Sequence, residues 1–376
     1  MKLANTILLS AAVFVGAFGA LYAFRTLERR EVTTIRVPIV SGGALLPAQA
    51  PGGAGAPDFR AAARQLERSV VSIDRLQRFS SFRFDEDRLA QTGSGSGVIV
   101  TAQGHIVTNN HVIEGADALI VRLSDGRSAP AEIVGADPQT DLAVLRITLP
   151  NLQPAQLGDS SQIEIGQWVL AVGNPLGFDN TVSAGVVSAV NRQLGTPGRG
   201  MLVDAIQTDA AINQGNSGGA LADAQGRVIG INTMIASTTG GSIGIGFAIP
   251  SNRVKRVVEE LVQYGRVRYG FLGADTFTQA GILADPQFRA WLGSQIGVEP
   301  PPMDTGLVIR GIRRGGGAAN AGMLPGDVLL EIEGRKLNHM GDLLSVLLDK
   351  RAGDAVRVRF WSRGETKTAN VRLTER

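Results

Sequence analysis

The residues best suited to chemistry lie at 208–220, where Ser217 stands in the pentapeptide Gly-Asn-Ser-Gly-Gly. A serine hydroxyl becomes an effective nucleophile when a neighbouring base takes its proton. The flanking glycines let the backbone turn tightly and aim N–H groups at one point. We expect the N–H groups of Gly215 and Ser217 to bind the oxyanion of an acyl-transfer reaction. An ordinary Gly/Asn/Ser turn between two strands is the alternative interpretation of the pentapeptide.

The pentapeptide also fits G-x-S-x-G, the strand-to-helix elbow that carries the nucleophile of α/β-hydrolases. That elbow precedes a helix, whereas residues 220–231 predict a strand, a tight turn and a second strand. The hydrolases also place a histidine after the serine. The one histidine after Ser217 is His339, which falls in a segment that belongs to another predicted domain. Both observations argue against the hydrolase fold.

The chain has 3 histidines, so few residues can act as the general base. His105 lies in an alternating pattern typical of a strand, whereas His111 follows the end of that strand. Asp141 opens the apolar run Asp-Leu-Ala-Val-Leu and is the candidate carboxylate that orients the imidazole. The order His111, Asp141, Ser217 is that of chymotrypsin-like double β-barrels.

Four segments together resemble the HtrA (Deg) family of serine proteases. They are Thr-Asn-Asn-His-Val around His111, Asp-Leu-Ala-Val-Leu from Asp141, Gly-Asn-Pro-Leu-Gly at 173–177, and the stretch around Ser217. The resemblance runs from about Ser69 to the C-terminus. It implies a mainly β protein: a chymotrypsin-like protease of two six-stranded β-barrels that meet at a cleft, then an α+β PDZ domain. It also implies a serine endopeptidase that needs neither a metal nor another cofactor.

Four segments differ in composition. Residues 1–30 predict a membrane anchor or signal segment, because 7–24 is an apolar run of about 18 residues. Residues 31–57 form a linker rich in Pro, Gly and Ala. The protease occupies 58–266 and the PDZ domain 267–376. One N-terminal apolar segment, one protease and one PDZ domain form a layout that is similar to DegS-like members of the family.

The resemblance places the protease in the periplasm. We expect the apolar run to be a transmembrane helix that attaches the protein to the bacterial inner membrane by a single span; a soluble periplasmic protein after signal cleavage is the alternative. The flanking charges favour the opposite orientation, because Lys2 precedes the apolar run whereas Arg25, Arg29 and Arg30 follow it. We expect the periplasmic arrangement, since a large folded body can cross a membrane despite modest flanking charge.

The composition of the chain argues against some kinds of partner and site. A net charge of +3 without a basic face argues against nucleic acid. A cysteine count of 0 excludes disulfides, a thiol nucleophile and a cysteine-based metal site. The resemblance to this family implies a trimer, so we expect a homotrimer. Phe79, Phe82 and Phe84, in the polar segment 78–92, are either incidental aromatics of a surface loop or part of the subunit contact.

Secondary structure follows from periodicity. Helices are predicted at 58–68, capped by Asp58, at 252–264 and at 342–350. Short strands are predicted at 70–73, 96–101, 118–123, 131–136, 142–147, 168–172 and 185–190. Residues 192–200 are expected to form a mobile loop. The resemblance implies that such loops carry an activating signal from the PDZ domain to the active site, and Arg192 is the candidate relay.

The residue type near the nucleophile predicts specificity. Trypsin-like enzymes carry an acid about six positions before the serine, whereas this chain has Ala211 followed by Ile212. We predict cleavage after small or medium aliphatic residues. Selectivity should be loose, because one methylene changes it by only about 1–3 kcal/mol. The resemblance suggests misfolded envelope proteins or a membrane anti-sigma factor as substrates.

Residues 270–274 resemble the carboxylate-binding loop of the family's PDZ domains. We expect Phe271, Leu272, Gly273 and Ala274 to bind the C-terminus of a peptide that adds a strand to the sheet. The long insert 276–304 is a candidate cover for part of that groove. A peptide-binding chaperone with little proteolytic turnover and an esterase-type hydrolase are the alternative functions.

Overall fold

The computed structural model describes residues 57–375 except 82–83, 175–179, 197–199, 214, 236–243 and 280. The predicted anchor and almost all of the predicted linker therefore lie outside the described residues. In the part of the chain that is described, no helix combines the length and the apolar character needed to cross a bilayer.

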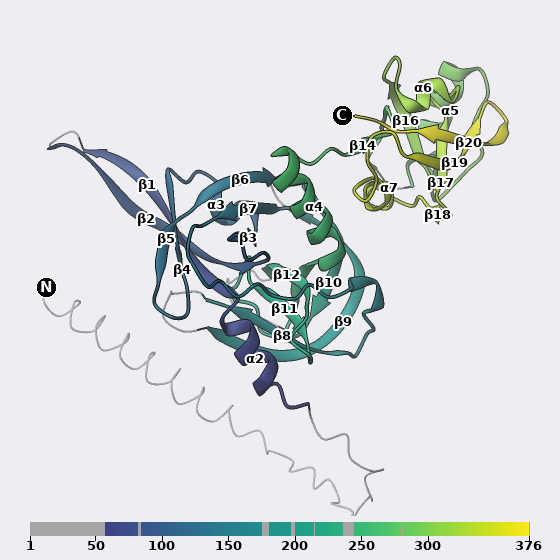
Figure 1. The fold of residues 1–376 in the computed structure, drawn as a ribbon. Helices are drawn as coiled ribbons and strands as arrows, with labels where there is room; N and C mark the ends of the chain where they lie inside the picture. The colour runs from purple at the N-terminus through teal and green to yellow at the C-terminus, as the bar shows by residue number, and fades with distance from the viewer. Residues whose placement is uncertain are drawn as a thin grey trace, which may run out of the picture. The chain divides into compact units, whose positions relative to one another are not determined.

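The first half of the protease is an antiparallel sheet of seven strands in the order β5-β4-β1-β2-β3-β7-β6. Its longest pair, β1 (Val70–Ser81) and β2 (Phe84–Ile99), extends beyond the rest of the sheet (Figure 1). The other strands are β3 (His105–Thr108), β4 (Ala118–Arg122), β5 (Ser128–Pro130), β6 (Glu132–Asp137) and β7 (Leu142–Arg146). Alternating Val, Ile and Leu side chains from these strands form a buried apolar core.

The second half is a closed barrel in the order β10-β13-β12-β11-β8-β9. Its strands are β8 (Trp168–Gly173), β9 (Thr181–Thr196), β10 (Gly200–Thr208), β11 (Ala220–Asp223), β12 (Val228–Ile235) and β13 (Gly246–Pro250). The prediction of two six-stranded barrels is therefore correct for this half. It is wrong for the first half, where the short strand β5 adds to the edge of the sheet.

Two helices begin and end the protease. α2 (Arg60–Glu67) buries Ala62 and Leu66. The predicted cap Asp58 accepts a hydrogen bond from the N–H of Arg60 at 3.0 Å, although the helix begins after Phe59. α4 (Ser251–Tyr264) buries Val254, Val257, Val258 and Leu261, the apolar face that its helical spacing predicts.

Two predicted loops belong to strands instead. Residues 78–81 and 84–92 of the polar segment continue the β1–β2 pair, in which hydrogen bonds to the partner strand offset the scarcity of apolar side chains. Residues 192–196 continue β9 and pair with β10. The side chains of Phe79, Phe82 and Phe84 lie outside the described residues, so the trimer contact stays a prediction.

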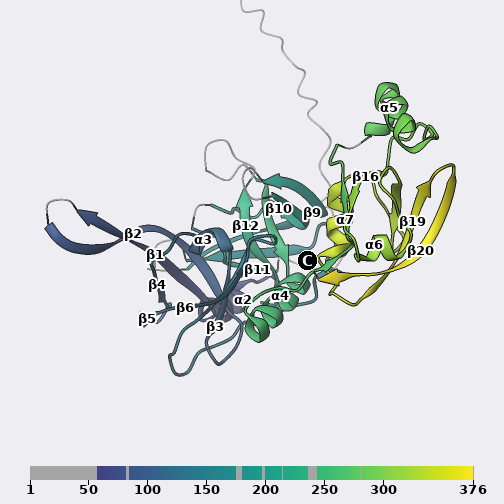
Figure 2. The same ribbon diagram turned by 90° about the horizontal axis from the view of Figure 1, so that it is seen from above.

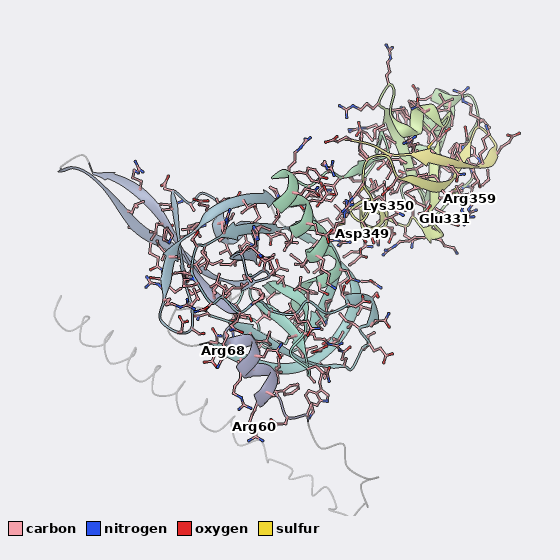
Figure 3. The ribbon with its side chains drawn as sticks, in the orientation of Figure 1. Arg60, Arg68, Glu331, Asp349, Lys350 and Arg359 are labelled. Atoms are coloured by element: carbon pink, nitrogen blue, oxygen red, sulfur yellow. The ribbon has the colours of Figure 1, made fainter. Side chains whose placement is uncertain are left out.

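The PDZ domain has a sheet in the order β15-β16-β17-β19-β20, in which β15 is an edge strand. Its strands are β15 (Ala274–Thr276), β16 (Leu307–Ile312), β17 (Val328–Ile332), β19 (Ala355–Ser362) and β20 (Glu365–Arg372). β18 (Arg335–Lys336) pairs with β17, and β14 (Gly270–Phe271) pairs with β21 (Thr374–Glu375). Glu331 and Arg359 form an ion pair of 3.0 Å across neighbouring strands (Figure 3).

Two helices, α6 (Gly317–Asn320) and α7 (Met340–Leu347), pack on one face of this sheet. Residues 276–304 form a separate layer with η2 (Ile282–Ala284) and α5 (Pro286–Ile296). The rings of Phe277, Phe288 and Trp291 pack together there, within 5.4–6.4 Å of one another.

The insert covers the opposite face of the PDZ sheet from α7. Its apolar residues pack against Val308 and Val328, whereas the neighbouring Ile309 and Leu329 pack on the side of α7. Consecutive strand residues face opposite sides of a sheet, which separates the two layers. Figures 1 and 2 accordingly show α5 apart from α7. The expectation that the insert covers part of the groove is therefore wrong for η2 and α5, although Thr276, the first residue of the insert, lines the groove.

Candidate active site

Two paired strands bring His111 and Asp141 together. β3 ends at Thr108, and the short helix α3 (Asn110–Ile113) carries His111 immediately afterwards. β7 begins at Leu142, and Thr108 pairs with Ala143. The imidazole and the carboxylate therefore emerge from the same end of an antiparallel pair.

The carboxylate of Asp141 holds His111 through two hydrogen bonds. Nδ1 of the imidazole lies 2.7 Å from Oδ2, and the backbone N–H of His111 donates to Oδ1 at 3.0 Å. A carboxylate at Nδ1 fixes the ring tautomer and leaves Nε2 to act as the base. Asp141 adopts this place with φ at 56°, a left-handed conformation that Asp and Asn tolerate better than most residues.

Thr233 is a site residue that the sequence did not reveal. Its hydroxyl donates to Oδ2 of Asp141 at 2.8 Å, and its carbonyl oxygen accepts from the hydroxyl of Ser217 at 3.1 Å. One residue of β12 thus contacts both the acid and the nucleophile. Within the described residues, the hydrogen bond of the Ser217 hydroxyl is to Thr233, and none joins it to His111. A threonine in a strand gives no signal of such a role, because threonine is common in strands.

The loop that carries Ser217 is held in a tight backbone conformation. Gly215 and Gly218 have φ at 95° and 84°, values that favour glycine. A Cβ added at Gly218 would collide with the backbone oxygen of Ser96. The oxyanion hole of Gly215 and Ser217 stays a prediction, because residue 214, which completes the peptide unit of Gly215, lies outside the described part.

The two residues predicted for the substrate pocket differ in accessibility. Ala211 is half-buried, and its carbonyl oxygen accepts from the hydroxyl of Ser183 at 2.8 Å. Ile212 is 1% exposed and packs within the core of the closed barrel. Ala211 is therefore the more accessible of the two, and neither residue brings a charge.

The predicted relay residue Arg192 lies in β9 and contacts the neighbouring strand. Its Nε donates to Oε1 of Gln207 at 2.9 Å. The next residue, Gln193, reaches the PDZ domain, where its Nε2 donates to Oδ1 of Asp342 at 2.9 Å. Gln193, beside the predicted relay residue, is therefore the one of the two for which a hydrogen bond to Asp342 is seen.

The PDZ groove is a cavity of ≈ 220 Å³ beside the free edge of β15. Its wall is mainly apolar and includes Leu343, Leu344 and Leu347 from α7. Of the predicted carboxylate-binding residues, Phe271 and Ala274 line the groove.

The remaining two carboxylate-binding residues shape the loop between β14 and β15. Leu272 packs in the core of the domain. Gly273 adopts a φ of 81°, and a Cβ there would lie 2.9 Å from the Cα of Gly316. Tyr269 also lines the groove, and burial together with the neighbouring Asp137 raises the pKa of its phenol well above the usual range.

Comparison with known proteins supports both the protease and the PDZ domain. Residues 95–231 match the family described as trypsin-like peptidase domain, and residues 294–373 match the PDZ domain family. A relative from Marinomonas sp., "Probable periplasmic serine endoprotease DegP-like", is 40% identical over 282 residues. That match covers 75% of this chain and 57% of the relative. The chain thus spans little more than half the length of the relatives of this kind.

Other matches extend over most of both chains. "Serine protease Do-like HtrA" of Lactobacillus helveticus is 39% identical over 340 residues, covering 83% of this chain and 80% of the relative. The solved structure "HtrA-type protease AlgWS227A with decapeptide" has a TM-score of 0.68 and 36% identity, covering 85% of this chain and 98% of that one. The crystal structure of the serine endoprotease from Yersinia pestis has a TM-score of 0.59 and 31% identity, covering 86% of this chain and 99% of that one.

Proposed function

This chain belongs to the HtrA family of trypsin-like serine proteases, and on that premise we propose that it is a serine endopeptidase regulated through its PDZ groove. One observation carries the catalytic part: Asp141 binds the imidazole of His111 at 2.7 Å and is linked to Ser217 through Thr233. This set of an acid, a base and a hydroxyl is the one that acyl transfer by serine requires.

In the proposed reaction, the hydroxyl of Ser217 turns from the carbonyl of Thr233 to Nε2 of His111. His111 takes the proton as the oxygen attacks a peptide carbonyl, and Asp141 stabilises the imidazolium that forms. The N–H groups of Gly215 and Ser217 bind the oxyanion. His111 then protonates the leaving amine, and a water molecule hydrolyses the acyl-enzyme. The small, uncharged side chain of Ala211 supports cleavage after small aliphatic residues.

The PDZ groove binds the C-terminus of a partner protein in this proposal. Support comes from the edge strand β15, the apolar wall from α7 and the glycine-containing loop at 270–273. One of the similar structures is of an HtrA-type protease with a decapeptide. Ligand binding at the groove then activates the protease, with Arg192 as the relay.

We place the enzyme in the periplasm of the bacterial envelope, as the names of several relatives suggest. Residues 7–24 either attach it to the inner membrane or serve as a cleaved signal. Misfolded envelope proteins or a membrane anti-sigma factor are the proposed substrates, within an envelope stress response. A homotrimer is the proposed assembly.

Cleavage of β-casein by residues 57–376 tests the proposal, with and without peptides that end in hydrophobic residues. We expect cleavage that peptides accelerate and that Ser217→Ala abolishes. Failure of the wild-type protein to cleave β-casein or short aliphatic peptides under any of these conditions would exclude the endopeptidase.

A peptide-binding chaperone with little turnover is the second candidate. It is favoured by the hydrogen bond of the Ser217 hydroxyl to Thr233 instead of His111. The same assay separates the two functions, because a chaperone would bind the peptides without any rise in cleavage. Its Ser217→Ala variant would also suppress casein aggregation as well as the wild type does.

A further inference from the structure

Ser96 is a fully buried residue of β2 that contacts the nucleophile loop from the other half of the protease. Its hydroxyl donates to the carbonyl of Gly215 at 2.6 Å, and its backbone N–H donates to the carbonyl of Ser217 at 2.8 Å. Gly215 and Ser217 are the residues whose N–H groups form the proposed oxyanion hole. We propose that Ser96 is the positioning residue that sets the geometry of this oxyanion hole.

The surroundings of the Ser96 hydroxyl fix the direction of its proton. The backbone N–H of Asn174 donates to Oγ of Ser96 at 2.8 Å. An amide N–H cannot accept a hydrogen bond, and the carbonyl of Gly215 can only accept one. The single proton of Ser96 therefore points to Gly215. The hydroxyl joins the end of β8 to the nucleophile loop through one acceptor and one donor bond.

The backbone around Ser96 lies directly against the nucleophile loop and the helix that carries the base. A Cβ at Gly95 would lie 2.7 Å from the side chain of Val112, the residue after His111. It would also lie 3.3 Å from the carbonyl oxygen of Ser217. Glycine at 95 permits this approach, and so does Gly218 on the facing loop.

Ser96 also belongs to the half of the protease that presents His111. β2 pairs with β3, the strand that leads into the His111 helix. Ser217 follows a strand of the closed barrel, which is the other half. The two bonds from Ser96 therefore align the nucleophile loop of one half with the base of the other.

This alignment matters because oxyanion donors act only within about 2.7–3.1 Å of the developing charge. Loss of the Ser96 hydroxyl would leave the buried carbonyl of Gly215 and the N–H of Asn174 without these partners. The residue that carries one oxyanion donor would then lose the side-chain hydrogen bond that fixes its carbonyl. The inference rests on the proposed endopeptidase, since an oxyanion forms only if Ser217 attacks a carbonyl.

Ser72 provides a matched control. It stands directly opposite Ser96 in the β1–β2 pair and is equally buried, at 0% exposure. Its hydroxyl has no hydrogen-bond partner among the described residues. Ser72→Ala thus removes the same group from the same sheet without touching Gly215 or Ser217.

The experiment compares steady-state cleavage of a short peptide by Ser96→Ala, Ser72→Ala and the wild type. We expect Ser96→Ala to lower kcat by about 10-fold or more, less than the roughly 10²–10³-fold cost of deleting an oxyanion donor itself. KM should stay within about 2-fold, because the effect is confined to the transition state. Ser72→Ala should keep both constants within about 2-fold of the wild type.

A second readout separates positioning from general loosening. A peptide aldehyde forms a tetrahedral adduct with Ser217 whose oxygen occupies the oxyanion site. Its affinity should fall in Ser96→Ala by the same factor as kcat/KM. In a Ser217→Ala background, which forms no adduct, Ser96→Ala should leave the affinity for a substrate peptide unchanged.

Three outcomes would overturn the inference while leaving the proposed function intact. They are an unchanged kcat in folded Ser96→Ala, an equal loss in Ser72→Ala, and an aldehyde affinity that does not change with kcat/KM. An inactive wild type would instead remove the proposed function. Should Ser96→Ala fail to fold, Ser96→Cys carries the comparison, since the thiol is a weak donor of similar size; wild-type kcat in that folded variant would also overturn the inference.

Discussion

The hydroxyl of Thr233 donates a hydrogen bond of 2.8 Å to the carboxylate of Asp141. The same carboxylate oxygen accepts the hydrogen bond from Nδ1 of His111. Thr233 is therefore placed to hold the acid in the orientation in which it can serve the base. It is 5% exposed and lies in β12, so its position is set by the barrel.

Thr233→Val should lower kcat/KM by roughly 10-fold. Valine keeps the shape and the strand preference of threonine but deletes the donor, and hydrogen bonds to charged groups contribute about 1.5–3 kcal/mol. Thr233→Ser restores a donor and should recover most of the activity. Peptide hydrolysis by the three proteins checks the prediction, and equal activity of the valine and serine variants would contradict it.

Asp141→Asn should lower kcat by about 10⁴-fold with little change in folding. The amide can occupy the same space but favours the wrong imidazole tautomer. Asparagine also tolerates the left-handed backbone that Asp141 adopts, with φ at 56°. Kinetics together with the midpoint of thermal unfolding test this separation. A variant that unfolds several degrees earlier would show that Asp141 has a structural role as well.

Leu344→Asp should abolish activation by peptides and leave basal turnover unchanged. Leu344 is half-buried and lines the PDZ groove, so a carboxylate there would lose hydration when an apolar peptide binds. The affinity for a peptide with a hydrophobic C-terminus should fall by about 10-fold or more. Val262→Asp, at a position of α4 that is 42% exposed and not part of the groove, is the control. Full activation of Leu344→Asp would place the peptide elsewhere.

Arg192→Ala should reduce the ratio of peptide-stimulated to basal turnover without changing peptide affinity. Arg192 holds Gln207 at 2.9 Å, and the adjacent Gln193 contacts Asp342 of the PDZ domain. Arg227→Ala, which breaks the ion pair with Asp223 in the same barrel, controls for loss of a surface arginine. An unchanged ratio in Arg192→Ala would exclude it as the relay.

His105 should make the protease less stable in acid. Burial, together with the charge of Arg146, lowers the pKa of its imidazole below 6.5. As the pH falls, the unfolded chain binds the proton before the folded protein does. The free energy of unfolding therefore decreases below pH 6.5 and continues to do so through the folded-state pKa. Urea unfolding at about pH 7 and about pH 5 should show a smaller loss for His105→Gln than for the wild type. Equal losses would count against this role.

The residue order His111, Asp141, Ser217 is what predicts the triad from the sequence. The pairing of β3 with β7, which brings His111 and Asp141 together, is visible only in the structure. The apolar spacing of α4 likewise predicted its buried face. Lone polar residues in strands carry no such signal. Thr233 and Ser96 reach the site through strand register and barrel closure, which are settled by packing between distant segments.

The length of strands β1 and β2 is another property that the sequence does not predict. The polar residues at 78–81 and 84–92 are typical of a loop, because apolar alternation is the sequence signal of a half-buried strand. Backbone pairing joins the two strands there, and it does not require an alternating apolar pattern. The position of the insert 276–304 could not be predicted either. The sequence does not say which face of the PDZ sheet the insert covers.

The hydroxyl of Ser96 crosses the boundary between the seven-stranded sheet and the closed barrel. The machinery of the enzyme is thus divided between two bodies, neither of which contains all of it. Warming that lets these bodies slide by a fraction of an ångström would silence the enzyme while each body kept its own secondary structure. The loss of activity on heating would then measure the relative movement of the two halves and not the unfolding of either half.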